Sequence, residues 1–193
     1  MSKNKKIELV GKVNLDLTNY NESFDVQPEP VLDELLCAVQ NSSQEELSVI
    51  VEQKKNWPFY YHLSPLRQNI VEWVPMNGNQ KIKVLEIGSE CGAVTGALLK
   101  KADQVDCVEV SKQMSLVNAH RHKDAENLSI YVGDLGEVED RLESAYDFIF
   151  LVGTLEHSTR YLKADDSYEG ILKIAMRHLA PEGHIILATA NKY

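Results

Sequence analysis

The sequence predicts a doubly wound α/β fold, in which helices cover both faces of a mostly parallel sheet. Two observations carry this prediction. From Lys81 onward, short apolar runs alternate with stretches of helical periodicity, and strands that alternate with helices form right-handed βαβ units. The apolar runs, such as "DFIFLV", are nearly continuous, which is typical of strands that are buried on both faces.

Five strands follow one another in this region, and we expect them to lie in the order 3-2-1-4-5. They are "KIKVLEIG" (81–88), "QVDCVEV" (104–110), "NLSIYVGD" (127–134), "YDFIFLVG" (146–153) and "GHIILATA" (183–190). The predicted helices between them are "AVTGALLKKA" (93–102), "SKQMSLVNAHRHK" (111–123, with Ser111 as N-cap) and "YEGILKIAMRHLA" (168–180, stopped by Pro181).

The N-terminal part of the chain has a different pattern, and we predict a small α+β cap over residues 1–58 and the α/β core over 59–193. "KIELVGKVNLDL" alternates apolar and polar residues around a glycine, which predicts a hairpin packed on the core. Pro30 is placed to start a helix, and Ser43 with Glu46 has the spacing of a capping box. A further helix is predicted over 64–75.

Composition excludes several classes of function. The net charge of −9 argues against nucleic acid, which is bound mainly by clustered Lys and Arg. The short basic group at residues 3–6 is interpreted as a solvated tail. Cys37, Cys91 and Cys107 fit neither a disulfide framework nor a zinc site. No apolar run reaches the roughly 20 residues of a membrane span, so we predict a cytoplasmic protein.

The loop "GSECG" (88–92) joins the first strand to the first helix, where backbone can approach a ligand closely. Glu109 ends the second strand, and its carboxylate can accept both hydroxyls of a ribose. Asp134 ends the third strand and can accept a hydrogen bond from an adenine amine. For either acid alone, a helix N-cap or a solvated loop residue is the other interpretation.

These segments resemble a known family. "VLEIGSECGAVTGAL", "VDCVEVS", "LSIYVGDL", "YDFIFLVGTLEH" and "LAPEGHIILAT" are similar to the successive motifs of class I S-adenosylmethionine-dependent methyltransferases, over roughly residues 60–193. The resemblance implies a Rossmann-like sheet with S-adenosylmethionine as cofactor. It implies that Glu86 and Gly88 line the methionine end, that Glu109 holds the ribose, and that Asp134 and Leu135 flank the adenine. The other residues predicted to contact the cofactor are Ser89, Glu90, Gly92, Val110, Val152 and Gly153.

A narrower resemblance concerns the acceptor of the methyl group. "WPFYYHLSPLRQNIVEW", "ENLSIYVGDL" and the terminal "NKY" are similar to bacterial methyltransferases associated with cell-surface glycan biosynthesis. We therefore expect a small-molecule or glycan-linked acceptor. The resemblance also implies two further strands after the fifth. The chain is thus expected to be a fragment of a longer protein, or its N-terminal segment replaces those strands. An uncovered sheet edge would allow a dimer.

Two other functions stay open at this stage. An NAD-dependent oxidoreductase needs a second glycine near the pyrophosphate, where this loop has Glu90, whose charge would repel it. S-adenosylmethionine has no phosphate and is a net cation, so acidic surroundings suit it better. The second alternative is a non-catalytic interaction domain with a vestigial nucleoside pocket.

Several residues have two interpretations each. Glu156 and His157 in "GTLEHSTRY" can act as a general base or orient an acceptor, or their loop only covers the cofactor. No metal site is predicted, because His120 and His122 do not share a helix face. Cys91 is either a reactive thiol or a packing residue. One aromatic group either stacks a ligand or seats the cap on the core: Trp57, Phe59, Tyr60 and Tyr61.

Glu90 stands where the resembling family usually has glycine. It requires either a backbone conformation that suits an L-residue or about 1–3 kcal/mol of stored strain. We therefore expect the loop to bind the cofactor more weakly than a glycine loop would.

Overall fold

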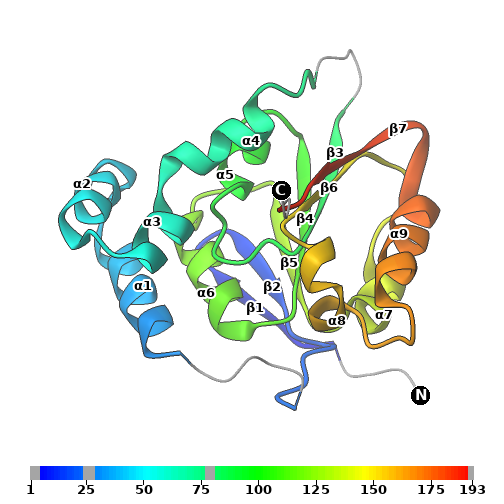
Figure 1. The fold of residues 1–193 in the computed structure, drawn as a ribbon, viewed down its shortest axis with the longest axis horizontal. Coiled ribbons are helices and arrows are strands. Elements are labelled where there is room, and N and C mark those ends of the chain that lie inside the picture. The colour runs from blue at the N-terminus through cyan, green and yellow to red at the C-terminus, as the bar shows by residue number, and fades with distance from the viewer. Residues whose placement is uncertain (1–4, 24–28, 77–80, 191–193) are drawn as a thin grey trace.

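The computed structural model describes residues 5–23, 29–76 and 81–190. Within them one twisted sheet runs through the molecule, with helices on both faces (Figure 1). The strand order is β1-β2-β5-β4-β3-β6-β7. Neighbouring strands are parallel except in the β1–β2 hairpin. The strands are β1 (Ile7–Val10), β2 (Val13–Asp16), β3 (Lys83–Ile87), β4 (Gln104–Glu109), β5 (Leu128–Val132), β6 (Tyr146–Val152) and β7 (Leu179–Ala188).

The five predicted strands are β3 to β7, and they lie in the predicted order 3-2-1-4-5, so the doubly wound fold is confirmed. The whole sheet is larger than predicted, because the N-terminal hairpin continues it. β2 pairs in parallel with β5, with Leu15 opposite Ile130. Val13 and Leu15 are both fully buried, so pairing with β5 covers the apolar face that the alternation predicted. The hairpin thus packs against the core, as predicted. The division of the chain at residue 58 stays a prediction.

The turn of the hairpin is tied to the core by backbone contacts. Gly11 has φ +61°, and a Cβ there would lie 2.2 Å from the carbonyl oxygen of Lys123. The amide of Lys12 donates to the same oxygen over 2.7 Å. Only glycine permits both this conformation and this approach, which explains the glycine in the alternating segment.

Helices divide between the two faces of the sheet, as Figure 1 shows. α5 and α6 cover one face, where Val84, Ala97 and Val105 are buried together. α7, α8 and α9 cover the other, where Ile87, Val108 and Ile171 meet. The helices are α1 (Pro30–Asn41), α2 (Gln44–Lys54), α3 (Trp57–Leu63), α4 (Asn69–Glu72), α5 (Thr95–Leu99), α6 (Lys112–Arg121), α7 (Leu135–Val138), α8 (Ser158–Tyr161) and α9 (Ser167–His178), with 3-10 turns η1 (Pro65–Gln68), η2 (Glu139–Arg141) and η3 (Leu155–His157).

The cap helices α1, α2 and α3 pack beside α6 through a third apolar cluster that includes Leu35, Phe59 and Val117. The predicted capping box of α2 is present: Ser43 accepts from the amide of Glu46, and the Glu46 side chain accepts from that of Ser43. Pro30 begins α1, as predicted. These local signals fix where the cap helices begin, and burial of their apolar faces fixes where they lie.

Some predicted helices have other bounds in the structure. The helix predicted over 93–102 is the shorter α5. The helix predicted over 168–180 ends at His178, and β7 already begins at Leu179. The residue before a proline disfavours the α conformation, so Pro181 acts on Ala180 before its own position. The helix predicted over 64–75 is the short turn η1 followed by α4. Ser64 does cap it, accepting from the amide of Leu66.

We expect the hairpin to contribute strongly to stability. Leu15→Ala should lower the free energy of unfolding by about 2–5 kcal/mol, because it leaves a cavity beside β5. Leu9→Ala, in the same hairpin but 71% exposed, should change it by less than about 0.5 kcal/mol. Urea unfolding of the two variants measures both values. Equal effects would contradict the placement of the hairpin.

Candidate functional site

The loop between β3 and α5 is shaped by three residues in the left-handed region, namely Gly88 (φ +82°), Glu90 (φ +45°) and Gly92 (φ +75°). The amide of Gly88 donates to the carbonyl of Val108 over 2.8 Å, which ties the loop to β4. A Cβ at Gly92 would lie 2.2 Å from Oδ1 of Asn118. Glycine is thus required at the two ends of the loop, and the middle position carries a residue with a side chain.

Glu90 keeps a positive φ, which costs a non-glycine residue about 1 kcal/mol. Of the two possibilities that the sequence left for this residue, the structure therefore has the strained conformation. Its carboxylate turns toward η1, where Oε2 lies 3.5 Å from Nη1 of Arg67. Burial, and then repulsion by Glu109, raises the pKa of Glu90, against the attraction of Arg67. Nδ1 of His62 lies 3.9 Å from the same oxygen.

His62 carries no charge near neutral pH. Burial, followed by repulsion from Arg67, Arg160 and Arg121, lowers the pKa of His62 to about 4. The contact of His62 with Glu90 is therefore polar rather than ionic, and Arg67 is the cation that pairs with Glu90.

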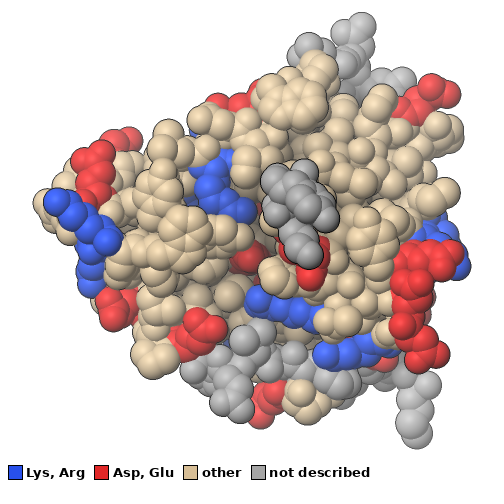
Figure 2. Space-filling view, viewed as in Figure 1, with Lys and Arg blue, Asp and Glu red and all other residues tan. Residues whose placement is uncertain are grey.

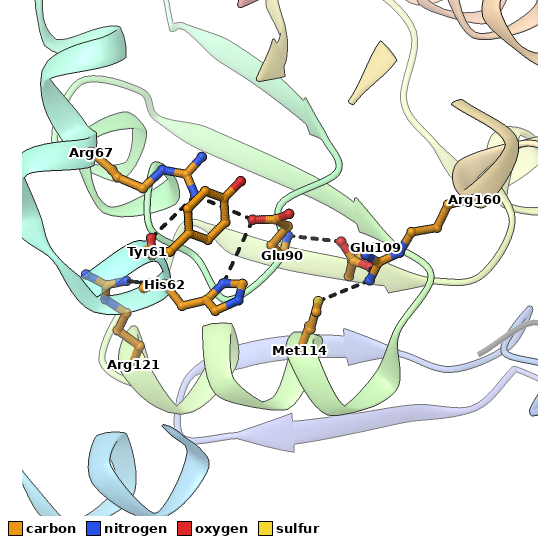
Figure 3. A network of polar contacts seen from close by, with 8 residues as sticks. All are labelled: Tyr61, His62, Arg67, Glu90, Glu109, Met114, Arg121 and Arg160. Carbon is orange, nitrogen blue, oxygen red and sulfur yellow. Dashed lines mark hydrogen bonds and ion pairs between the residues drawn. The ribbon is translucent and has the colours of Figure 1, made fainter. Parts of the chain in front are cut away.

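Glu109 lies at the carboxyl end of β4 and is fully buried. Its Oε2 accepts from the amide of Glu90 over 2.9 Å, and its Oε1 from the amide of Ser111 over 3.0 Å. Nη2 of Arg160, on α8, lies 3.5 Å from Oε1. Burial raises the pKa of Glu109, while Arg160 and the backbone amides oppose that rise. Figure 3 shows Glu109 between the Glu90 loop and Arg160.

Glu86 does not face the edge of the sheet. It lies inside β3, where its Oε2 accepts from Oγ1 of Thr95 over 2.7 Å and contacts Sγ of Cys107. Burial raises the pKa of Glu86 to about 7. Asn118, on α6, donates to Oγ1 of Thr95, on α5. Buried hydrogen bonds therefore link β3 to α5 and α6 beneath the loop.

Asp134 is the N-cap of α7. The sequence allowed this interpretation as well as ligand binding. Its Oδ1 accepts from the amide of Gly136 over 2.9 Å, and its Oδ2 from the amide of Lys163 over 2.7 Å. Leu135, the next residue, is fully buried. Gly88, Glu109 and Asp134 therefore lie at three neighbouring strand ends, as the predicted strand order requires.

Other predicted residues lie around the same edge or below it. Ser89 is buried and its hydroxyl has no partner among the described residues, and Val110 is buried in the apolar cluster on the face that α7, α8 and α9 cover. Val152 ends β6, and Gly153, the next residue, has φ +72°. A Cβ at Gly153 would meet the Tyr61 hydroxyl and Oε1 of Glu156 only at about 4 Å, so there is room above it.

Glu156 and His157 form η3 directly after that glycine. Glu156 accepts from the Thr189 hydroxyl and from the amide of Ala190. Desolvation would raise its pKa, but these hydrogen bonds and its own amide together lower the pKa of Glu156. His157 is exposed. The structure thus places Glu156 as an anchor between η3 and β7 and leaves His157 on the surface.

The aromatic group of the cap divides into two roles. Phe59 is buried among the cap helices and seats them on α6. Trp57 is 69% exposed, and its ring lies 5.6 Å from that of Tyr61. The Arg67 guanidinium lies 4.0 Å over the Tyr61 ring. An aromatic and cationic stack therefore leads from the surface at Trp57 to the loop at Glu90.

Sequence reasoning missed Arg67, Arg160 and Tyr161. Arg67 follows the predicted N-cap Ser64 by one turn, and Arg160 and Tyr161 stand four and five residues beyond Glu156. Nothing in the composition of these segments indicated the three residues. They matter because the fold places them against Glu90, Glu109 and Gly88. The basic side chains near the site come from the cap and from α8, which the strand pattern does not describe.

Cysteine and metal chemistry find no support at this edge. Burial raises the pKa of Cys91 and of Cys107 well above the usual value, so Cys91 is a packing residue. In residues 5–23, 29–76 and 81–190, no group of three His, Cys, Asp or Glu side chains could hold a metal ion. Nor does any helix of those residues have the length and apolarity to cross a membrane.

On the face in Figure 2, basic and acidic side chains form small scattered groups.

Four cavities among the described residues lie away from the Gly88–Glu109 edge. One of about 570 Å³ opens between α2 and the α5–α6 region and is lined by Arg121 and His122. Arg121 is almost fully buried and donates to the carbonyls of His62 and Leu63 at the end of α3. Burial lowers the pKa of Arg121 to about 10. This cavity borders the junction of the cap and the core.

Comparisons with known proteins agree with this geometry. The sequence model of a family described as "Methyltransferase domain" matches residues 85–185. The search of curated proteins found no match. Among solved structures, phosphoethanolamine N-methyltransferase 1 of Haemonchus contortus, in complex with phosphoethanolamine and S-adenosylhomocysteine, is 20% identical with a TM-score of 0.52. The CurJ carbon methyltransferase is 19% identical with a TM-score of 0.53.

Both similarities concern the fold and only part of each larger protein. Each alignment covers 78% of this chain, but 35% of the Haemonchus contortus protein and 40% of CurJ. The chain therefore spans well under half the length of these two structures.

We expect the free energy of unfolding to depend on pH through His122, which contacts the loop at Gly92. Burial, followed by repulsion from Arg121, lowers the pKa of His122 to about 4, and its Nε2 lies 3.1 Å from the carbonyl oxygen of Gly92. The unfolded pKa is about 6.5, so the unfolded state binds more protons as pH falls. The stabilisation by neutral His122 is present above pH 6.5 and is lost as pH falls toward 4.

From pH 7.5 to pH 5, the wild type should lose about 2 kcal/mol more stability than His122→Gln. Urea unfolding at the two pH values measures the difference. His184→Gln, a change at an exposed histidine, is the control and should follow the wild type. Equal losses in the wild type and in His122→Gln would contradict the prediction.

Proposed function

Because the chain belongs to the methyltransferase domain family, we propose that it transfers a methyl group from S-adenosylmethionine to a small-molecule or glycan-linked acceptor. The observation that carries the proposal is the buried Glu109 carboxylate at the end of β4, beside the left-handed loop at Gly88. Two carboxylate oxygens at this place match the two hydroxyls of a ribose.

The residues at this edge fit S-adenosylmethionine in charge. The cofactor has an electrophilic methyl group on a sulfonium and is a net cation. Glu90, Glu109 and Asp134 give the edge an acidic character that suits a cation. The same charges would repel the pyrophosphate of a dinucleotide, which disfavours the oxidoreductase alternative.

In this proposal Glu109 holds the ribose, while Asp134 and Leu135 flank the adenine. Gly88 lets the methionine end approach the backbone, and Glu86 supports the loop from below through Thr95. Ser89, Gly92, Val110, Val152 and Gly153 shape the surroundings. Methyl transfer then depends mainly on holding the donor and acceptor in line.

The acceptor is proposed to enter beside Gly153. The space above Gly153, the exposed Trp57 ring and the Tyr61 hydroxyl support this entrance. An aromatic face can stack a planar group or the apolar face of a sugar ring. His157 is exposed on the nearby turn η3, and in this proposal it is the base that takes up the proton of a hydroxyl acceptor. Phosphoethanolamine, in the Haemonchus contortus complex, is a small-molecule acceptor on a similar fold.

One observation favours the rival function, a non-catalytic domain with a vestigial nucleoside pocket. Arg160 already contacts Glu109, and Asp134 is fully engaged by two backbone amides. Binding experiments separate the two functions, since the rival domain binds neither the cofactor nor its demethylated product. The proposed location remains the cytoplasm, where S-adenosylmethionine is made.

Glu109→Ala should weaken the binding of S-adenosylhomocysteine by about tenfold or more, because hydrogen bonds to a charged carboxylate are lost. Isothermal calorimetry on the wild type and the variant measures this. Glu126→Ala, which removes an exposed acid paired with Lys12, is the control and should not alter affinity. A thermal melt must show that Glu109→Ala is folded. Unchanged affinity in a folded variant would place the ligand elsewhere.

Glu90→Gly should bind S-adenosylhomocysteine a few-fold more tightly than the wild type, because glycine relieves the strain at positive φ and opens the approach to the backbone. Glu90→Gln keeps the side chain and removes its charge, so it separates geometry from electrostatics. We expect it to resemble the wild type. If Glu90→Gly binds no better, Glu90 is an adapted part of the site rather than an obstruction.

A further inference from the structure

One short segment, residues 158–163, reaches each of the three groups that the sequence assigns to the ligand. A Cβ at Gly88 would lie 3.1 Å from Cζ of Tyr161. Nη2 of Arg160 lies 3.5 Å from Oε1 of Glu109. The amide of Lys163 donates to Oδ2 of Asp134 over 2.7 Å. The ends of β3, β4 and β5 are thus all contacted from within the chain by α8 and the residues that follow it.

The backbone of this segment is firmly held. Tyr161 is 2% exposed and packs among the residues that cover this face of the sheet. The hydroxyl oxygens of Ser158 and Ser167 lie 2.8 Å apart, which fastens the start of α8 to the start of α9. With Tyr161 and Lys163 fixed, the Arg160 side chain is aimed at Glu109. It is a quarter exposed, so this side chain can turn to solvent while the backbone stays.

The bonds of Glu109 show why Arg160 matters. A carboxylate offers about four acceptor positions, and the amides of Glu90 and Ser111 take two of them. Arg160 takes a third. A ribose that presents two hydroxyls needs two positions, so one of the three donors has to leave. The amides belong to the loop and to the start of α6, and Arg160 is the one occupant that is a side chain.

The charge of Arg160 also favours competition with the cofactor. The guanidinium is positive, and S-adenosylmethionine carries a net positive charge. A cation at Glu109 neutralises the acidic group that we propose holds the ribose, and it repels the incoming cofactor. Arg160 also contacts Sδ of Met114 over 3.1 Å, so its guanidinium lies between Glu109 and Met114 (Figure 3).

We propose that Arg160 is an internal competitor for the ribose carboxylate and thereby sets the affinity of the site for its cofactor. The inference rests on the function proposed above. Arg160 contacts Glu109 in the position that the ribose would take, so binding requires its side chain to turn away. The apparent affinity is then reduced by the fraction of molecules in which Arg160 is turned away.

The experiment measures binding of S-adenosylhomocysteine by calorimetry at pH 8, where protonation of Glu109 interferes least. Arg160→Gln should bind about three- to tenfold more tightly than the wild type. Arg160→Lys keeps the charge and should stay nearer the wild type. Arg177→Gln removes an exposed arginine of α9 that pairs with Glu139, and it should leave affinity unchanged.

The outcomes separate this inference from the proposed function. Tighter binding by Arg160→Gln alone supports the inference, including the case in which the wild type shows no binding and the variant does. If the wild type binds and Arg160→Gln binds equally or more weakly, Arg160 is not a competitor, and the proposed function stands. If both proteins are folded and neither binds, the proposed function is wrong, and so is the inference, because removal of the competitor did not open the site.

Discussion

The buried carboxylate of Glu109 is the interaction on which the organisation of this edge depends. A desolvated carboxylate needs donors, and here they come from the Glu90 loop, from the start of α6 and from α8. One side chain therefore connects the loop after β3, the end of β4 and the segment after β6. The loop reaches this carboxylate through the amide of Glu90, a residue that itself lies in the left-handed region.

Much of the fold and part of the site were predictable from the sequence. The alternation of apolar runs with helical stretches predicted the order of β3 to β7, and the methyltransferase family is confirmed by the match over residues 85–185. Parallel strands end at one edge, so Gly88, Glu109 and Asp134 had to be neighbours. Arg67 and Arg160 were not predictable, since their roles depend on the packing of α8 and of the cap against that edge. The bond that Glu86 accepts from Thr95 was likewise not predictable, because it depends on how α5 packs over β3.

The cap and the core share more structure than their sequence patterns indicate. The hairpin lies in the same sheet as the core strands, and Arg121 of α6 donates to the last carbonyls of α3. A buried guanidinium bonded to carbonyl groups at a helix C-terminus is favoured by the dipole of that helix. These bonds hold the end of α3, which lies between Tyr61 and the η1 turn that carries Arg67.

The three cysteines give the molecule a built-in chemical reporter. Cys37 is exposed on the cap, whereas Cys91 lies within the loop and Cys107 beneath it, both fully buried. Only a thiolate reacts quickly with an alkylating reagent, and burial suppresses it at the two inner positions. In the native protein, labelling is therefore directed to Cys37. Slow labelling of Cys91 would record how often the loop opens, while labelling of Cys107 would record the rarer exposure of the strand below it.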